Sequence, residues 1–325
     1  MATVTKYIDR DNNGGAEATG DSWGDAYPTL DAWQTANAKD LVTATETHVA
    51  YYRAANNNPR TAVFTFSGWT TSSEYNVSLI VPVANRHSGR RGTGTRIIVE
   101  DTGFGTPVLS GTPNYTRIEG LSVENGGGAT EIGLGSYSRI IGCLFVVNGS
   151  GGGRPTIHHL SVAQNCIFIR IGANVEAAIG ASSSAENRPT FINCTGYRSG
   201  GDNTVAAIAA DTNGYIARSC YAYSVGATRG YSQYQTSRSD CFSGNDDDPD
   251  GYVSFDNAAF EETDVLLLTS SSALIDAGQD NSAHEAWDGE GVDILGTPRP
   301  QGSAWDIGAH EFAVVVPMPQ YIYGE

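Results

Sequence analysis

Acidic side chains are the residues of this chain best able to do chemistry, because two carboxylates about 5 to 10 Å apart can hydrolyse a glycosidic bond. The candidates in the central region are Glu119, Glu124, Glu131, Glu176, Glu186, Asp202, Asp211 and Asp240. They do not recur at one position of the surrounding pattern, so they predict no row of carboxylates along a surface. The sequence therefore assigns no catalytic residue. It leaves enzymatic activity open and favours a protein without it.

Basic side chains are scarce where a lyase would need them. Lysine does not occur after Lys39. The candidate bases for a lyase of the pectate type are then Arg170, Arg198 and Arg218. His158 and His159 are adjacent, and adjacent residues of a strand face opposite ways. They predict an ordinary surface pair, not a shared site.

A second acidic group follows the central region, in a turn between Gly244 and Gly251. Its carboxylates are Asp246, Asp247, Asp248 and Asp250. Oxygen ligands gathered around a turn can bind calcium, although this run lacks the spacing of an EF-hand loop. An acidic turn is more commonly just solvated. Calcium is the one cofactor that the sequence leaves open, and it indicates no other.

The element that must position these residues is an internal repeat. One short pattern recurs six times, with its anchors at Leu121, Cys143, Cys166, Cys194, Cys220 and Cys241. Successive anchors lie 22, 23, 28, 26 and 21 residues apart. A unit of this size built from short strands cannot bury its own apolar face, so it must stack on copies of itself.

A backbone bend precedes each anchor. The residues at that position are Gly120, Gly142, Asn165, Asn193, Ser219 and Asp240. Gly, Asn and Asp adopt left-handed conformations at low cost. Apolar residues two positions past several anchors have the period of a strand with one buried face. The sequence therefore predicts strand, corner and strand in each copy, and an all-β fold: a parallel β-helix solenoid.

The anchors should form an inward ladder of leucine and cysteine. Cysteine packs as a small hydrophobe and is among the most buried residue types. Disulfides or a metal site are the alternative. The odd count of five cysteines and the absence of a Cys-x-x-Cys pair favour packing. Reduced thiols fit a protein folded in the cytoplasm.

The net charge of −17 disfavours nucleic acid and anionic membranes as partners. The first residues have no basic segment followed by an apolar one, and no run reaches transmembrane length. We expect a protein that is made in the cytoplasm without a signal peptide and is not anchored in a membrane.

The N-terminal region predicts a strand from Thr3 to Ile8 and a short helix after Pro28. Leu30, Trp33 and Ala36 share one face of that helix, which would cover the open first turn of the solenoid. Trp23 and Trp33 as a sugar-binding platform are the alternative interpretation.

These opening residues resemble a known class of proteins. Tyr7-Ile-Asp9, a Gly-rich turn, Ser22-Trp23 and Thr29-Leu30 are similar to the beginning of right-handed parallel β-helix proteins of bacteria and bacteriophages. The resemblance implies a right-handed solenoid. It does not imply one activity, since this fold serves many functions.

The segment Ser272 to Gly278 and the strand-like Asp306 to Glu311 resemble the closing module of the same proteins. The resemblance implies an irregular cap over the last turn. It also implies a network of Asp276, Asp293, Arg299, Asp306 and Glu311. Arg299 would form charge-assisted hydrogen bonds with Asp293, Asp306 or Glu311. A structural network is favoured over a catalytic pair.

We divide the chain into an N-terminal strand and capping helix (1–45), the β-helix (46–260), the C-terminal cap module (261–312) and an extended tail (313–325). Within the β-helix, the basic cluster Arg86, Arg90 and Arg91 predicts a solvated loop or a contact with an acidic neighbouring subunit.

The tail combines three valines and two tyrosines around two prolines, so it should be extended. An apolar extended segment can add as a strand to another chain. The expected docking residues are Val314, Val315, Val316, Tyr321, Ile322 and Tyr323.

The favoured function is a non-enzymatic structural protein on the surface of a particle, such as a bacteriophage capsid decoration or tail spike, docked through its terminal segments. Its partners would be other virion subunits in an oligomer, with a trimer as the arrangement suggested by analogy. The alternatives are a polysaccharide lyase or glycosidase of the tailspike depolymerase type, or an adhesin that binds cell-surface polysaccharide.

Overall fold

The architecture is seen in a computed structural model of the 325-residue chain. It describes residues 1–11, 18–54, 59–99, 107–111, 113–125, 131–148, 156–171, 179–182, 188–199, 207–210, 214–224, 237–239, 241–243, 260–262, 265–270, 272–287 and 291–313. Among these residues, no helix has the length and hydrophobicity needed to cross a membrane.

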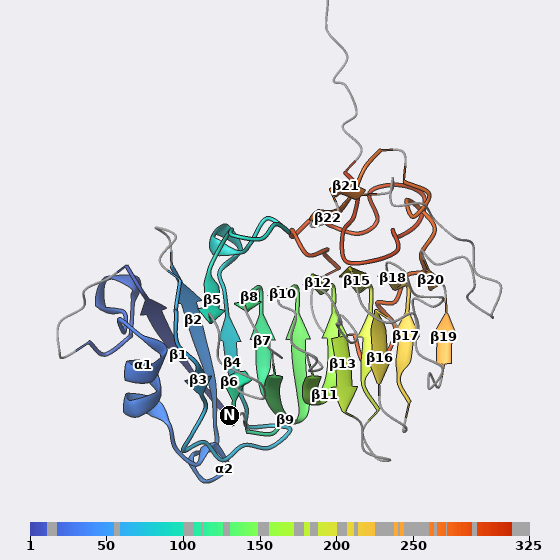
Figure 1. The fold of residues 1–325 in the computed structure, drawn as a ribbon. Helices are drawn as coiled ribbons and strands as arrows, with labels where there is room; N and C mark the ends of the chain where they lie inside the picture. Colours follow the sequence, from blue (N-terminus) through green and yellow to red (C-terminus); the bar gives the residue numbers. More distant parts are fainter. Residues whose placement is uncertain are drawn as a thin grey trace, which may run out of the picture.

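Two sheets of parallel strands form the body (Figure 1). We call the 13-stranded one sheet A and the seven-stranded one sheet C. The main path of sheet A is β1 (Ala2–Asp9), β2 (Glu46–Arg53), β4 (Val77–Ile80), β7 (Arg117–Glu119), β9 (Glu131–Ile141), β11 (Thr156–Gln164), β14 (Thr190–Ile192), β17 (Ile216–Arg218) and β19 (Ser237–Ser239). Its other strands are β3 (Phe64–Thr65), β6 (Pro107–Ser110), β13 (Ile179–Ser182) and β16 (Ile208–Ala210).

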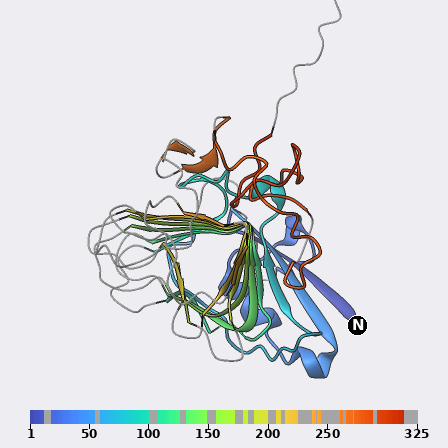
Figure 2. The same cartoon turned by 90° about the vertical axis from the view of Figure 1, so that its right-hand side faces the viewer.

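Sheet C consists of β5 (Arg96–Val99), β8 (Ser122–Asn125), β10 (Leu144–Asn148), β12 (Ile167–Ile171), β15 (Thr195–Ser199), β18 (Tyr221–Ser224) and β20 (Phe242–Ser243). From β7 onwards the chain passes from a strand of sheet A through one corner into a strand of sheet C. Each strand pairs in parallel with the strand one turn further on. Parallel pairing between consecutive turns, with the strands enclosing the interior in Figure 2, is a parallel β-helix, as the repeat predicts.

The corner between the two sheets is left-handed backbone. Gly142 has φ 56°, Asn165 52°, Asn193 49° and Ser219 46°. The corners stack through hydrogen bonds, since Gly142 N donates to Gln164 O at 2.9 Å and Asn165 N donates to Ile192 O at 3.0 Å. The predicted bends are therefore confirmed at these positions, whereas Asp240 lies outside the described residues.

The helical elements gather at the first turns. They are η1 (Trp23–Asp25), α1 (Leu30–Asn37), α2 (Leu41–Ala44) and η2 (Val83–Asn85). Thr29 Oγ1 accepts from Ala32 N at 3.0 Å and caps α1. Leu30 and Trp33 of α1 are buried, and the Trp33 ring lies 5.3 Å from that of Trp69. The helix thus contributes to the core at the N-terminal end of the solenoid (Figure 1).

The C-terminal module lies beside the solenoid and not across its last turn. It begins with the antiparallel pair β21 (Phe260–Glu262) and β22 (Val265–Leu268) and continues to residue 313. Figures 1 and 2 show it above sheet C, outside the enclosed interior. Leu266 and Ile294 pack there against Ile167 and other outward residues of β10, β12 and β15. The expectation from the resemblance, a cap over the last turn of the solenoid, is therefore wrong: the described part of the module packs on the outer side of sheet C.

The reason for this position is that β10 and β12, in the middle of sheet C, carry apolar side chains on both faces. Phe168 points into the solenoid core, whereas Ile167 and Ile169, on either side of it, point outward. Outward Leu144 and Val146 of β10 extend the same surface. This surface has to be covered, and the module covers it.

Candidate functional site

The six anchors occupy the interior column of the solenoid. All of them are fully buried: Leu121, Cys143, Cys166, Cys194, Cys220 and Cys241. The five cysteines are free thiols. Cys194 Sγ donates to Ile192 O at 3.3 Å and to Ala163 O at 3.4 Å, and Cys166 Sγ donates to Gln164 O at 3.2 Å. Burial raises the pKa of the Cys166, Cys194 and Cys220 thiols well above the usual value. This burial suits packing and disfavours the thiolate form that a nucleophile needs.

Arg299 lies at the centre of the C-terminal module. Its Nη1 donates to Glu311 Oε2 at 2.9 Å, and both side chains have no exposed surface. The same nitrogen donates to Asp306 O at 3.1 Å, and Nη2 donates to Gly308 O at 2.9 Å. Of the three carboxylates that the sequence offered, Glu311 makes the direct ion pair.

The other carboxylates of this network accept hydrogen bonds from the backbone. Asp306 accepts from Asp276 N at 2.7 Å and from Phe312 N at 2.6 Å. Asp293 accepts from Glu311 N at 2.9 Å and from Thr297 N at 2.7 Å. Burial raises the pKa of Asp293, and it raises that of Asp306 to about 6. These groups are arranged to tie irregular loops together, and each carboxylate is already engaged in doing so.

The corner residues of the solenoid also hold the module. Asn165 Nδ2 donates to Val292 O at 2.6 Å, and Asn281 Nδ2 donates to Asn193 Oδ1 at 3.1 Å and to Ser219 Oγ at 3.1 Å. The same positions thus provide a left-handed corner and a polar contact. The sequence predicted the left-handed corner but not the polar contact. The signal for that contact was that Asn or Ser, and not Gly, stands at these corners.

The loop after η2 holds the two described acidic candidates. Arg86 forms an ion pair with Glu119, which also accepts from Arg117 Nη2 at 2.8 Å. Glu124 is 5% exposed and accepts from Gly92 N at 2.8 Å. Arg91 Nε lies 3.5 Å from a Glu124 oxygen. Arg86 and Arg91 of the basic cluster therefore pair within their own chain.

His87 fixes this loop to a corner of the solenoid. The ring is 2% exposed, and its Nε2 is 2.9 Å from Gly142 O while Nδ1 accepts from Gly89 N at 3.2 Å. Both contacts require the neutral imidazole with its proton on Nε2. Desolvation by burial lowers the pKa of His87 to about 4.

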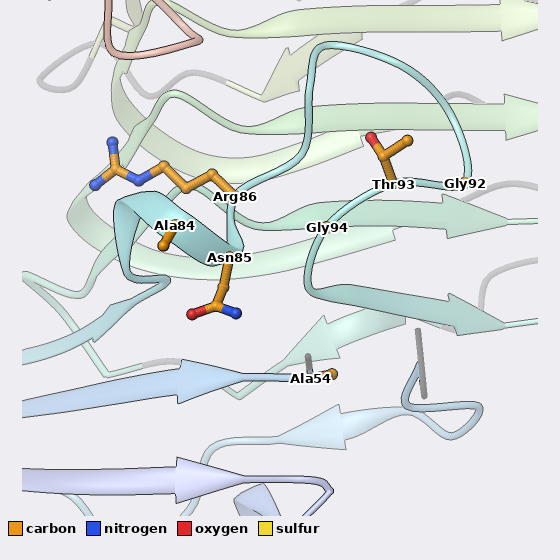
Figure 3. Close-up of a pocket in the computed structure, with 7 residues that line it drawn as sticks. All are labelled: Ala54, Ala84, Asn85, Arg86, Gly92, Thr93 and Gly94. Carbon is orange, nitrogen blue, oxygen red and sulfur yellow. The ribbon is translucent and has the colours of Figure 1, made fainter. Parts of the chain in front are cut away.

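A polar pocket of about 310 Å³ lies beside the same loop. Its lining residues are Ala54, Ala84, Asn85, Arg86, Gly92, Thr93 and Gly94. Figure 3 shows Asn85 directed towards the end of β2, which Ala54 follows, whereas the side chain of Arg86 runs the other way. Among the described residues, the lining of this pocket includes no carboxylate or imidazole that could act as a general acid or base.

The candidate bases of a lyase do not share a surface. Arg170 and Arg198 are paired neighbours on β12 and β15, and neither has any exposed surface. Their strand neighbours Ile169 and Tyr197 point outward. Because side chains alternate along a strand, both arginine side chains point into the solenoid. Arg218 is half-buried on β17. A polymer in solution cannot reach the first two.

Several predicted residues fall outside the described part of the chain. These are the calcium candidates Asp246, Asp247, Asp248 and Asp250, the tail residues Val314, Val315, Val316, Tyr321, Ile322 and Tyr323, and Glu176, Glu186, Asp202, Asp211 and Asp240. The side chains of Glu131, His158 and His159 are likewise not described. Within the described residues, no group of three or more His, Cys, Asp or Glu side chains is placed to hold a metal ion.

Two tyrosines form a feature that sequence analysis missed. Tyr115 and Tyr137 both have left-handed backbone, with φ 59° and 61°, on successive turns. Their rings stack at 4.9 Å with an interplanar angle of 11°. Tyr137 remains 46% exposed. A bulky residue rarely adopts this backbone, and such conformations gather at binding sites. In contrast, Trp33 of the earlier aromatic hypothesis is fully buried and cannot contact a sugar.

Comparisons with known proteins add little to this geometry. The sequence matches no protein-family model and no curated protein. Among solved structures, the chain is similar to the pectate lyase Pel9A, with a TM-score of 0.37 and 13% sequence identity over 94% of this chain and 96% of that one. A score this low supports no argument about activity. The assignment of the fold therefore rests on the strand pairing itself.

Proposed function

We propose that this protein is a non-enzymatic structural β-helix of a particle, a bacteriophage virion component of the capsid decoration or tail spike kind, that docks through its terminal segments, the C-terminal tail among them. One observation carries the non-enzymatic part. Four of the described candidates are engaged elsewhere or enclosed: Glu119 and Glu124 pin the loop after η2, and Arg170 and Arg198 lie inside the solenoid.

The docking part rests on the tail sequence. Val314 to Val316 are β-branched and apolar, and Pro317 ends any strand that they form, because it has no N–H to donate. Such a segment gains most by pairing with a sheet edge on another chain.

The test compares the full chain with a chain that ends at Ala313, each mixed with particles that lack this protein. We expect the full chain to sediment with the particles and the shortened chain to stay in the supernatant while keeping its β-rich circular dichroism. Equal binding by both would contradict docking through the tail. Release of oligosaccharides from host polysaccharide by the purified chain would contradict the non-enzymatic part.

A carbohydrate-binding adhesin is the second candidate, and the stacked pair Tyr115 and Tyr137 is the observation that favours it. Exposed aromatic rings can bind the apolar faces of sugars. Replacement of Tyr137 by Ala should abolish glycan-array binding if this function holds, whereas replacement of exposed Val83 should leave it unchanged.

A further inference from the structure

The first strand of sheet A has an edge that is only partly covered. β1 ends the strand order of the sheet, with β2 on its other side. At its far end, Tyr7 N donates to Gly20 O at 2.8 Å, Tyr7 O accepts from Tyr27 N at 2.9 Å, and Asp9 N donates to Tyr27 O at 2.9 Å. Residues 20 to 27 therefore close this half of the edge.

The near half of the edge is open among the described residues. Alternate residues of a parallel strand turn their backbone groups to the same side. Ala2 N bonds towards β2, and Tyr7 and Asp9 bond away from it, so Thr3 and Thr5 face the open side. Both threonines are exposed. Four backbone groups, two N–H and two C=O, are thus presented in a row, which is a template for one more strand.

We infer that Val314 to Val316 of a second copy of this chain add to β1 at Thr3 and Thr5, so that copies join head to tail. This inference rests on the proposed docking role of the tail and names its partner. Three residues match an edge with two outward-facing positions, and Pro317 stops the pairing at the end of the run. The added strand also covers the half-buried side chain of Val4.

The distance along the solenoid requires that the strand come from another copy. Ala309 N donates to Thr195 Oγ1 at 3.0 Å, and Phe312 packs in the cluster of Tyr221, so the chain leaves the module near β15 and β18. The corresponding strand of sheet A, β14, lies six pairings from β1. Six pairings span about 29 Å at roughly 4.8 Å each. Residues 314 to 316 extend only about 10 Å beyond Ala313.

Charge gives the association a distinctive salt dependence. Each copy carries a net charge of −17, so two copies repel one another. Backbone pairing and apolar burial are the attractive contributions, and added salt screens the repulsion. Association should therefore strengthen between low and physiological salt, whereas an association through ion pairs would weaken.

The test is sedimentation of the full chain over a dilution series, with two substitutions at one edge position. Thr5→Pro removes the edge N–H without touching a bond to β2, whereas Thr5→Val keeps that N–H. We expect Thr5→Val to associate like the parent and Thr5→Pro to lose about tenfold or more in association constant. Thr3→Pro is the second edge variant if Thr5→Pro alters the circular dichroism spectrum.

The outcomes separate this inference from the proposed function. Equal association by the Pro and Val variants would overturn the edge site, even if truncation after Ala313 abolishes association. A chain that stays monomeric at every concentration and salt would overturn self-association. If that monomer still binds particles through its tail, the proposed function survives.

Discussion

At the scale of single residues, polar and thiol groups of this protein are used to fix the backbone. The cysteine column shows this most simply, because four of its thiols each fill a small interior space and donate to a carbonyl: Cys143, Cys166, Cys194 and Cys220. A column of this kind gains nothing from oxidation and should be insensitive to the redox state.

Replacing Cys194 by Ser should lower the free energy of unfolding by about 1 to 2 kcal/mol, because the hydroxyl is costlier to bury than the thiol. Chemical denaturation with and without reductant checks this. Cys194→Ala is the control that removes the group without adding a hydroxyl. A loss of stability in the parent on adding reductant would contradict the free thiols.

Replacing Arg299 by Met should cost about 3 to 5 kcal/mol, since it leaves Glu311 buried without its partner and two carbonyls without a donor. Arg299→Met with Glu311→Gln should recover part of that loss. Hydrogen exchange at residues 291–313 is the suitable measurement. A single variant as protected as the parent would show that the ion pair does not hold the module together.

His87 should make the loop at residues 83–94 sensitive to acid. Its folded pKa of about 4 lies below the ordinary value of 6.5, so the folded state binds fewer protons. Stability of this loop is thus complete above pH 6.5 and falls by about 3 kcal/mol as the pH falls to 4. The positive charge of Arg86 beside the ring also lowers the pKa of His87.

The measurement is hydrogen exchange of the loop between pH 6.5 and 4, with His87→Gln as the control that can still donate to Gly142 O. The variant should lose the pH dependence. A local readout is needed because the raised pKa of Asp306 acts in the opposite direction, favouring the fold as the pH falls from about 6 towards 3.8. Unchanged loop protection in the parent would contradict the prediction.

At the scale of elements, sheet C and the C-terminal module stabilise one another. Replacing outward Ile169 by Asp should detach the module and expose an apolar surface, at a cost of about 3 kcal/mol or more. Binding of a hydrophobic dye and faster proteolysis of residues 265–313 report this. Val83→Asp, at a position 65% exposed, is the matched control. Equal dye binding by both variants would contradict the packing.

The repeat and its corners could be predicted from sequence because they depend on local rules. Left-handed backbone at Asn165 and Asn193 follows from residue type, and the anchor spacing follows from the length of a turn. The position of the module could not be predicted in the same way. It depends on Ile167 and Ile169 facing outward, whereas the repeat pattern indicates only which residues face the buried interior. Likewise, the choice of Glu311 as partner of Arg299 depends on how three loops fold together.

At the scale of the whole molecule, the solenoid presents different surfaces at its two ends and on its sides. The module covers the outward side of β10, β12 and β15 in sheet C, and among the described residues β1 presents an edge that is open at Thr3 and Thr5. A chain whose tail docks on such an edge builds a heterologous contact, which gives closed rings or open rows according to the rotation between copies.

The most direct test of a particle role is immunogold electron microscopy of virions from the native source with antibody against this chain. We predict regular labelling of heads or tails. The contrary result is unlabelled particles with the protein free in solution, and it would move the assignment to a carbohydrate-active or carbohydrate-binding β-helix.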